Sequence, residues 1–394
     1  MTGRARVAGV GMVPFKKPGA SDGYQEMGEA AIRAALEDAG LPYSAVQQVY
    51  AGYVYGDSTC GQAVAYRAGT TGVPIVNVNN NCSTGSTALF LARQAVEAGV
   101  VECALAVGFE EMRPGALGSS FADRANPMVR HLEAMTGLQE YSASAPVAAQ
   151  FFGGAGQEYA DKYGARPETF AKISVKARRH AANNPLALFR DPVTVDQVLA
   201  SPHLYGPITR LQSCPPTCGA AAAVIVSPEF ARKHGLEAPV EIVAQAMTTD
   251  TSATFEAKSM MQVVGYDMSK EAAREVYEKA GIGPSEVQVA ELHDCFTANE
   301  LLLYEALGFT PEATAEKFIN DEDNTYGGKI VTNPSGGLLS KGHPLGATGL
   351  AQCAELVWQL RGQADRRQVD DVRFALQHNI GLGGAAVVTL YGRA

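Results

Sequence analysis

The sequence contains no run of 18 consecutive apolar residues, so no stretch is long enough for a transmembrane helix. Its first residues lead into a strand-like segment without the apolar core of a signal peptide. The seven cysteines are odd in number and scattered, unlike the paired cysteines of a small secreted protein. We therefore expect a soluble cytoplasmic protein with reduced thiols and no membrane span.

Positive charge is also in deficit. The chain has 32 Lys and Arg against 41 Asp and Glu, a net charge of −9, which argues against nucleic acid as a partner. It has neither a Walker A loop nor a GxGxxG fingerprint. Cys214 and Cys218 form the one close cysteine pair, and without a matching second pair we expect no metal site.

Apolar residues and glycine are plentiful. Hydrophobic residues make up 46% of the 394 residues, enough for a large core divided over two or three packed units. The 41 glycines cluster in particular loops, where they favour close approach of the backbone to a neighbour or a ligand.

Three segments recur in the same order, which indicates an internal duplication. Each copy of the first is an amphipathic helical pattern ending at Ala-Gly, followed by a turn and an apolar strand. The matched ranges are 34–54 with 275–296, 81–99 with 342–362, and 219–227 with 383–390. The second match sets Cys82 opposite His343.

The pattern predicts an α/β fold built from two similar halves, residues 1–237 and 238–394. In both halves buried Val, Ile and Ala strands alternate with helices, as in a mixed or parallel sheet covered on two faces. Residues 110–210 have no counterpart in the second half. We interpret them as an inserted loop domain over one face, the usual place for a substrate lid.

Cys82 lies where a strand-like segment gives way to a helical one. The N-terminus of a helix favours a thiolate and can bind an oxyanion; the alternative is a buried packing cysteine. His343 lies in the most glycine-rich run, with an exposed turn histidine as the alternative. If the duplication brings two helix N-termini together, thiol and imidazole form a pair suited to nucleophilic catalysis.

Two further segments carry candidate groups. His293 and Cys295 of HDCF (293–296) follow an apolar strand and are spaced to point to one side, with an incidental core pair or a metal-like fragment as the alternative. Residues 375–388, with His378, Asn379 and a glycine cluster, either offer main-chain N–H groups to an oxyanion or form a closely packed strand. The remaining histidines are expected to be solvated: His131, His180, His203 and His234.

Taken together, these motifs resemble the thiolase superfamily, most closely its sterol-carrier-protein-2 (SCP2) thiolase branch, whose bacterial relatives are termed lipid-transfer proteins. The segments that carry the resemblance are NNNCSTGS (79–86), HDCF (293–296), NPSGGLLSKGHPLGATG (333–349), QHNIGLGGA (377–385) and GYVYGDSTCGQ (52–62). The resemblance implies a five-layered αβαβα fold with an inserted loop domain, usually in a homodimer or tetramer.

The resemblance also implies roles. Cys82 would take the acyl group of a 3-ketoacyl-CoA as a thioester, and His343 would activate it and help form an oxyanion hole. His293 replaces the asparagine of the usual motif and would hold the water of that hole. Cys295 would be the second, acid/base cysteine, because Asn379 stands where other branches carry it. Gly381 would contribute a backbone N–H.

The same resemblance implies coenzyme A as co-substrate, acyl-CoA as substrate and no bound cofactor. Cys218 stands where relatives carry an aspartate, with an effect that the sequence leaves open. Two alternatives follow from the fold: an acyltransferase or retro-aldolase subunit that works with a small accessory protein, and a non-catalytic lipid or acyl-CoA binder.

Overall fold

The computed structural model describes residues 3–113, 121 and 123–394. Ten strands form one mixed sheet in the order β10-β9-β11-β12-β8-β1-β7-β4-β2-β3. Its two five-stranded halves meet where β1 pairs with β8 through Arg6–Glu241 and Val7–Val240. The strands are β1 (Arg6–Met12), β2 (Gln48–Gly52), β3 (Ile75–Val78), β4 (Cys103–Glu110), β7 (Gly219–Val226), β8 (Val240–Thr248), β9 (Val289–Glu291), β10 (Val331–Thr332), β11 (Phe374–Gly381) and β12 (Ala385–Arg393).

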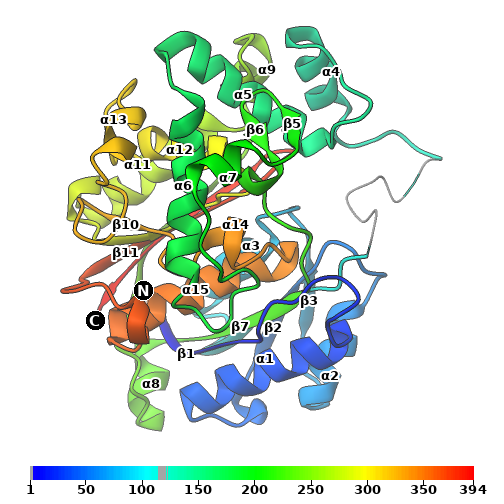
Figure 1. The fold of residues 1–394 in the computed structure, drawn as a ribbon. Coiled ribbons are helices and arrows are strands. Elements are labelled where there is room, and N and C mark those ends of the chain that lie inside the picture. The colour runs from blue at the N-terminus through cyan, green and yellow to red at the C-terminus, as the bar shows by residue number, and fades with distance from the viewer. Residues whose placement is uncertain (1–2, 114–120, 122) are drawn as a thin grey trace.

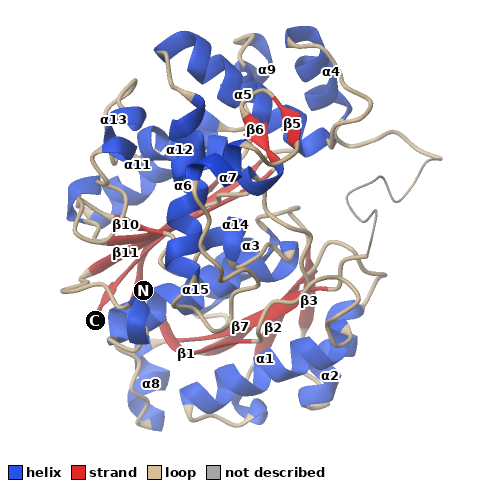
Figure 2. Ribbon diagram, in the orientation of Figure 1, coloured by secondary structure: helices blue, strands red, loops and turns tan. Residues whose placement is uncertain are grey.

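The halves stack in five layers, which Figures 1 and 2 show edge-on. Helices α1 (Tyr24–Ala39) and α2 (Cys60–Ala68) cover the outer face of the first half-sheet. Helices α11 (Tyr266–Ala280) and α12 (Thr297–Ala306) cover the second. Between the half-sheets lie α3 (Thr84–Glu97) and α15 (Leu345–Arg361). This is the predicted αβαβα arrangement.

The duplication is confirmed strand by strand. The first half runs β3-β2-β4-β7-β1 and the second β10-β9-β11-β12-β8, so each strand has a counterpart at the same place. Helices α1 and α11 end at Gly40 and Gly281, which take left-handed φ angles of 66° and 72°. Glycine adopts this conformation at little cost, so each helix stops where the sequence predicts.

The two central helices touch at their N-terminal turns because both carry glycine there. A Cβ on Gly85 would lie 2.6 Å from the Gly346 carbonyl oxygen, and one on Gly349 would lie 2.2 Å from the Ser86 backbone nitrogen. Helix α15 is buried on almost every side, as expected for a helix that is apolar or small around its circumference. The close crossing brings the segments just before α3 and α15 together.

The insertion lies over the second half (Figure 1). It packs α5 against α12 and α6 against both α12 and α14 (Gly337–Ser340). Buried Phe151 and Phe170 join the same apolar core as α12. Its elements are α4 (Val129–Leu138), α5 (Val147–Tyr163), α6 (Pro167–Ala181), α7 (Val195–Leu199), β5 (His203–Tyr205) and β6 (Ile208–Thr209). The predicted range 110–210 includes positions outside the described residues.

The other helices are α8 (Pro228–His234), α9 (Ser252–Glu256), α10 (Met260–Val263) and α13 (Ala315–Asn320), with short 3₁₀ turns at Tyr43–Ala45, Arg210–Gln212, Pro284–Glu286 and Asp365–Arg367. Among the described residues no helix is both long enough and apolar enough to cross a bilayer.

The expectation of solvated histidines is wrong for two of the four. His131 and His180 are 6% and 2% exposed. His131 lies against the Asp250 carboxylate at 2.9 Å, and His180 lies 3.0 Å from the Asn333 carbonyl oxygen. The polar residues next to these two histidines in the sequence gave no sign of burial, because their hydrogen-bond partners come from distant segments. His203 and His234 are exposed as expected.

Candidate active site

Cys82 lies in a tightly pinned turn between β3 and α3. Asn81 takes a left-handed φ of 51°, which asparagine tolerates better than most residues. The Ser83 hydroxyl donates to the Asn80 carbonyl at 2.8 Å, and the Thr84 hydroxyl donates to the Asn81 carbonyl at 2.6 Å. Ser83 is the N-cap of α3. Cys82 therefore stands just ahead of the helix N-terminus, as predicted.

His343 lies in the loop between α14 and α15, and its hydrogen bonds fix its tautomer. Its Nδ1 atom is 2.7 Å from the Thr348 hydroxyl, which itself donates to the Pro344 carbonyl at 2.9 Å. With that hydroxyl proton directed to the Pro344 carbonyl, we assign the other proton to Nδ1, which donates to the Thr348 oxygen. Nε2 is then an acceptor, and it is buried without a hydrogen-bond partner in the described part of the chain.

The structure brings Cys82, His293 and His343 to one point. The Cys82 Sγ atom and one ring nitrogen of each histidine lie within 4.8 Å of one another. The two rings meet edge to face, with centres 5.1 Å apart and planes at 85°. A thiol beside an acceptor nitrogen is the arrangement that nucleophilic catalysis requires. The same three atoms are close enough to share a metal ion.

Cys295 lies at the edge of this cluster. It is 3% exposed, and its carbonyl accepts a hydrogen bond of 2.8 Å from the Cys214 backbone. Burial holds the pKa of Cys295 well above its usual range, and the charges of Cys214 and Cys82 raise it further.

Asp294, between these two residues, ties the HDCF segment to the loop of His343. Its carboxylate accepts hydrogen bonds from the backbone of Leu338 at 2.6 Å and Leu339 at 3.3 Å. Gly337 has a φ of +60°, and a Cβ there would lie 2.1 Å from the Asp294 Oδ2 atom. The contact needs glycine at this position, which explains part of the glycine-rich run.

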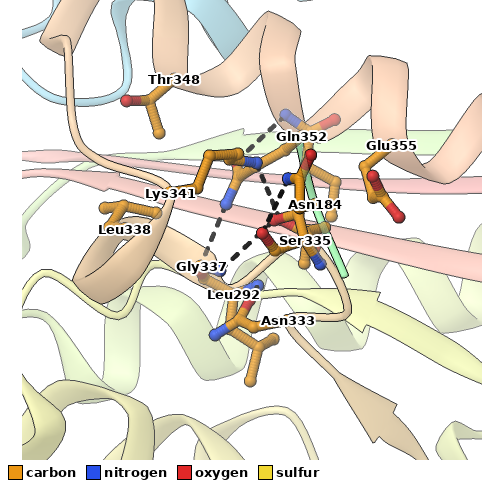
Figure 3. Close-up of polar contacts among 12 residues, drawn as sticks. Asn184, Leu292, Asn333, Ser335, Gly337, Leu338, Lys341, Thr348, Gln352 and Glu355 are labelled. Atoms are coloured by element: carbon orange, nitrogen blue, oxygen red, sulfur yellow. Dashed lines mark hydrogen bonds and ion pairs between the residues drawn. The ribbon is translucent and has the colours of Figure 1, made fainter. Parts of the chain in front are cut away.

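A buried polar network holds the rest of that loop (Figure 3). The Asn333 side chain accepts from the Leu292 backbone at 2.7 Å, and the Asn184 amide donates to the Ser335 carbonyl at 2.9 Å. Lys341 forms a fully buried ion pair of 3.2 Å with Glu291. Asn184 follows helix α6, so the insertion braces the loop that carries His343.

Gly381, the last residue of β11, packs against the Cys82 turn. A Cβ at this position would lie 2.1 Å from the Asn80 carbonyl oxygen, so a side chain would displace the turn. The next residue is also tied in, because the Asn81 amide donates to the Leu382 carbonyl at 2.9 Å. The end of β11 therefore packs directly against the turn that carries Cys82.

The fold agrees with comparisons to known proteins. Family models described as the thiolase N-terminal domain and the thiolase C-terminal domain-like match residues 6–204 and 249–393. Sterol carrier protein 2 of Oryctolagus cuniculus is 57% identical over 98% of this chain and 72% of its own length. The chain belongs to the thiolase family.

Two further relatives extend this thiolase assignment. The benzoylsuccinyl-CoA thiolase subunit BbsB of Thauera aromatica is 36% identical, covering 98% of this chain and 97% of that protein. A solved structure titled Ltp2-ChsH2(DUF35) aldolase superposes with a TM-score of 0.83 at 25% identity, covering 99% of this chain and 98% of that one.

Ionisation in this thiolase site differs from the expectation of a thiolate. Burial and the charge of Glu110 raise the pKa of Cys82 to about 12. Burial lowers the pKa of His343 to about 3 and holds that of His293 well below its usual range. Desolvation outweighs the helix terminus here, so all three groups are neutral at pH 7.

Glu110 was missed by the sequence analysis. This last residue of β4 accepts backbone hydrogen bonds from Tyr55 at 2.8 Å and Gly346 at 2.9 Å, and so holds the first turn of α15. Burial raises its pKa to about 7. A lone acid at the end of an apolar strand, CALAVGFE, was the available signal.

The segment 213–218 was also missed as part of the site. Ser213 pairs with Phe296 and Pro216 pairs with His343, so the segment lies alongside both catalytic loops. Cys218 at its end is buried, and its thiol lies 3.4 Å from the Met112 carbonyl oxygen. Cys218 is thus a packing residue between segments of the first half.

Proposed function

We propose that this protein is a thiolase that cleaves 3-ketoacyl-CoA with CoA through an acyl-enzyme on Cys82, in the degradation of fatty acids or sterol side chains. The observation that carries the proposal is the group of Cys82, His293 and His343 atoms within 4.8 Å, with Cys295 two positions after His293. Cleaving a carbon–carbon bond beside a ketone requires a nucleophile, a base, oxyanion donors and an acid. This site holds a candidate for each.

In the first half-reaction Cys82 Sγ bonds to C3 of the substrate while its proton passes to His343 Nε2. Donors from His293 and from the Gly381 backbone stabilise the resulting oxyanion. The C2–C3 bond then breaks, its electron pair remains on C2 as an enolate, and the Cys295 thiol protonates C2. The shortened CoA thioester leaves, and Cys82 keeps the acyl group.

In the second half-reaction the Cys295 thiolate takes the proton of an incoming CoA thiol. The CoA sulfur attacks the thioester carbon, the Cys82–carbon bond breaks, and the Cys82 sulfur recovers its proton from His343. One acyl-CoA leaves, and both cysteines and the histidine return to their starting forms. The cycle requires no bound cofactor.

The test is CoA-dependent cleavage of a panel of straight-chain, branched and steroid 3-ketoacyl-CoAs by the purified protein. Cys82→Ala should abolish cleavage, while Cys353→Ala, which truncates a buried thiol in the middle of α15, should preserve it. Cleavage that survives in Cys82→Ala, or a folded wild type inactive on the whole panel, would contradict the proposal.

One observation supports a second candidate, a retro-aldolase subunit that acts with a small accessory protein. The solved structure with a TM-score of 0.83 over 99% of this chain is titled an aldolase with a DUF35 partner. A retro-aldolase breaks the carbon–carbon bond of a 3-hydroxyacyl-CoA without acylating a cysteine. Cleavage of hydroxyacyl substrates that persists in Cys82→Ala, with a partner that co-purifies stoichiometrically, would identify it.

We further propose that the active form is a cytoplasmic homodimer, to be tested by light scattering across a concentration series. A scattering mass of one chain at assay concentrations would contradict the dimer. A non-catalytic lipid or acyl-CoA carrier is the remaining alternative, and it would bind acyl-CoA while leaving Cys82 unmodified.

A further inference from the structure

A series of buried side chains, linked by hydrogen bonds, leads from the core to His293. The His293 Nδ1 atom lies 2.7 Å from the Asn379 amide nitrogen Nδ2. On its other side the Asn379 amide oxygen is 3.0 Å from the Ser86 hydroxyl. Asn379 and Ser86 are fully buried, and His293 is 1% exposed. Strand β11 and helix α3, from opposite halves, thus meet behind the histidine.

The first member of this hydrogen-bonded series is Gln377, and the orientation of its amide is unambiguous. The Gln377 amide nitrogen Nε2 lies 2.7 Å from the Gly349 carbonyl oxygen, and its oxygen Oε1 lies 2.5 Å from the Tyr391 hydroxyl. A backbone carbonyl can only accept, so the NH₂ group must face Gly349. The same nitrogen donates to the Ser86 oxygen at 2.8 Å.

Each later orientation follows from the previous one. Because Ser86 receives a proton from Gln377, its own proton is directed to the Asn379 oxygen. The Asn379 NH₂ group then faces His293 and donates to Nδ1. Turning this amide over would set a second N–H against the Ser86 oxygen and deprive the buried Ser86 proton of its acceptor, at a cost of about 1–3 kcal/mol.

We propose that Asn379 is a positioning residue that fixes His293 as the tautomer with its proton on Nε2. His343 is the opposite tautomer, with Nε2 free of a proton, so the Cys82 thiol meets one accepting and one donating imidazole. This inference rests on the proposed function in one respect, namely that the Nε2–H of His293 serves as an oxyanion donor. The tautomer itself does not depend on which reaction the site performs.

The proposal also assigns a positioning role to residue 379, which lacks the acid/base cysteine of other branches. Asn379 stands where the resemblance implies an acid/base cysteine in other branches. Here its amide shares the site with a histidine at 293 in place of the usual asparagine, which needs no tautomer control. A histidine in an oxyanion hole does need it, because one of its two neutral forms presents a lone pair to the oxyanion.

The direct test is ¹⁵N NMR of protein labelled in histidine, with His293→Asn used to assign the signals. Wild type should show an unprotonated Nδ1 and a protonated Nε2 for His293. Asn379→Asp places an acceptor against Nδ1, so the Nδ1 signal should shift to the protonated position. An unprotonated Nε2 in wild type, or no change in Asn379→Asp, would overturn the proposal.

Ser86→Ala gives a second and milder test. Without the Ser86 acceptor and donor, the Asn379 amide can turn, and His293 should show a mixture of tautomers. The matched control is Ser269→Ala, which removes an equally buried serine hydroxyl lying 2.9 Å from Nε2 of a different histidine, His378. The control should leave the His293 signals in place. An unmixed His293 in folded Ser86→Ala would contradict the relay.

Activity separates this inference from the proposed function. If the protein is a thiolase, Asn379→Asp should lower kcat by about 10²–10³ with little change in KM, as for the loss of an oxyanion donor. If wild type lacks thiolase activity but shows the stated tautomer, the positioning role stands and the proposed function fails. If activity is present and the tautomer is reversed, the positioning role fails alone.

Discussion

The imidazole rings of His293 and His343 meet edge to face with centres 5.1 Å apart, and a nitrogen of each lies within 4.8 Å of the Cys82 sulfur. Each ring is held from behind by a different partner: His293 by Asn379, and His343 by Thr348. The first half therefore supplies the thiol, and the second half supplies two histidines whose hydrogen bonds differ. Four predictions follow from the surroundings of this group.

Thr348→Val should lower kcat by about a hundredfold, because His343 then loses the acceptor that keeps its proton on Nδ1. KM should change little, since Thr348 is buried beneath the histidine. Thr348→Ser, which keeps the hydroxyl, should recover most of the activity. Steady-state kinetics of the two variants, with circular dichroism to confirm folding, decide the matter. Full activity in Thr348→Val would show that the hydrogen bond does not set kcat.

The alkylation of Cys82 by iodoacetamide should be slow at pH 7 and accelerate about tenfold per pH unit up to pH 10. The pKa of this thiol is raised to about 12 by burial and by Glu110, and the thiolate is the reactive form. Peptide mass spectrometry of timed samples gives the rate at Cys82 alone. A rate that levels off below pH 8 would indicate a thiolate–imidazolium pair instead.

Glu110→Gln should alter how stability depends on pH. The folded protein raises the pKa of Glu110 from 4.5 to about 7, so the folded state binds its proton more tightly than the unfolded state does. Its contribution is complete below pH 4.5 and is lost as the pH rises to 7. The free energy of unfolding of wild type relative to Glu110→Gln should therefore fall by about 2 kcal/mol from pH 5 to pH 8.

Urea unfolding at both pH values measures this difference, with the exposed Glu237→Gln as the control. A difference between wild type and Glu110→Gln that stays constant with pH would mean that the carboxyl is ionised throughout this range.

Cys295→Ala should block proton transfer to carbon while leaving the nucleophile intact. Exchange of the acetyl-CoA methyl hydrogens with deuterated water should fall by at least about a hundredfold, because the acid/base thiol is missing. Alkylation of Cys82 should continue at a similar rate. Mass spectrometry follows both processes, and exchange at the wild-type rate in the variant would remove Cys295 from its proposed role.

The sequence carries the fold well because the duplication leaves local marks in both copies. Gly40 and Gly281 end matching helices, and Gly85 and Gly346 mark the helix crossing at the centre. From that crossing alone the meeting of Cys82 and His343 could be predicted. The structure places Cys82 and His343 atoms within 4.8 Å of each other, as the alignment of the two copies predicts.

The sequence does not reveal the burial and the hydrogen bonds that distant segments create around a residue. Burial raises the pKa of Cys82, an effect that the adjacent helix terminus gave no reason to expect. His180 is buried against the Asn333 carbonyl 153 positions away. The partners of Glu110 likewise come from the loop after β2 and from α15, which no local pattern links. Desolvation and these long-range hydrogen bonds can be identified only in the folded structure.

The central claim is that Cys82 carries the acyl group. Incubation of the protein with a 3-ketoacyl-CoA without free CoA, followed by acid quenching and peptide mass spectrometry, tests it most directly. The account predicts one acyl group on the peptide containing Cys82, lost on addition of CoA and absent in Cys82→Ala. An unmodified Cys82 in protein that has cleaved its substrate would contradict the account.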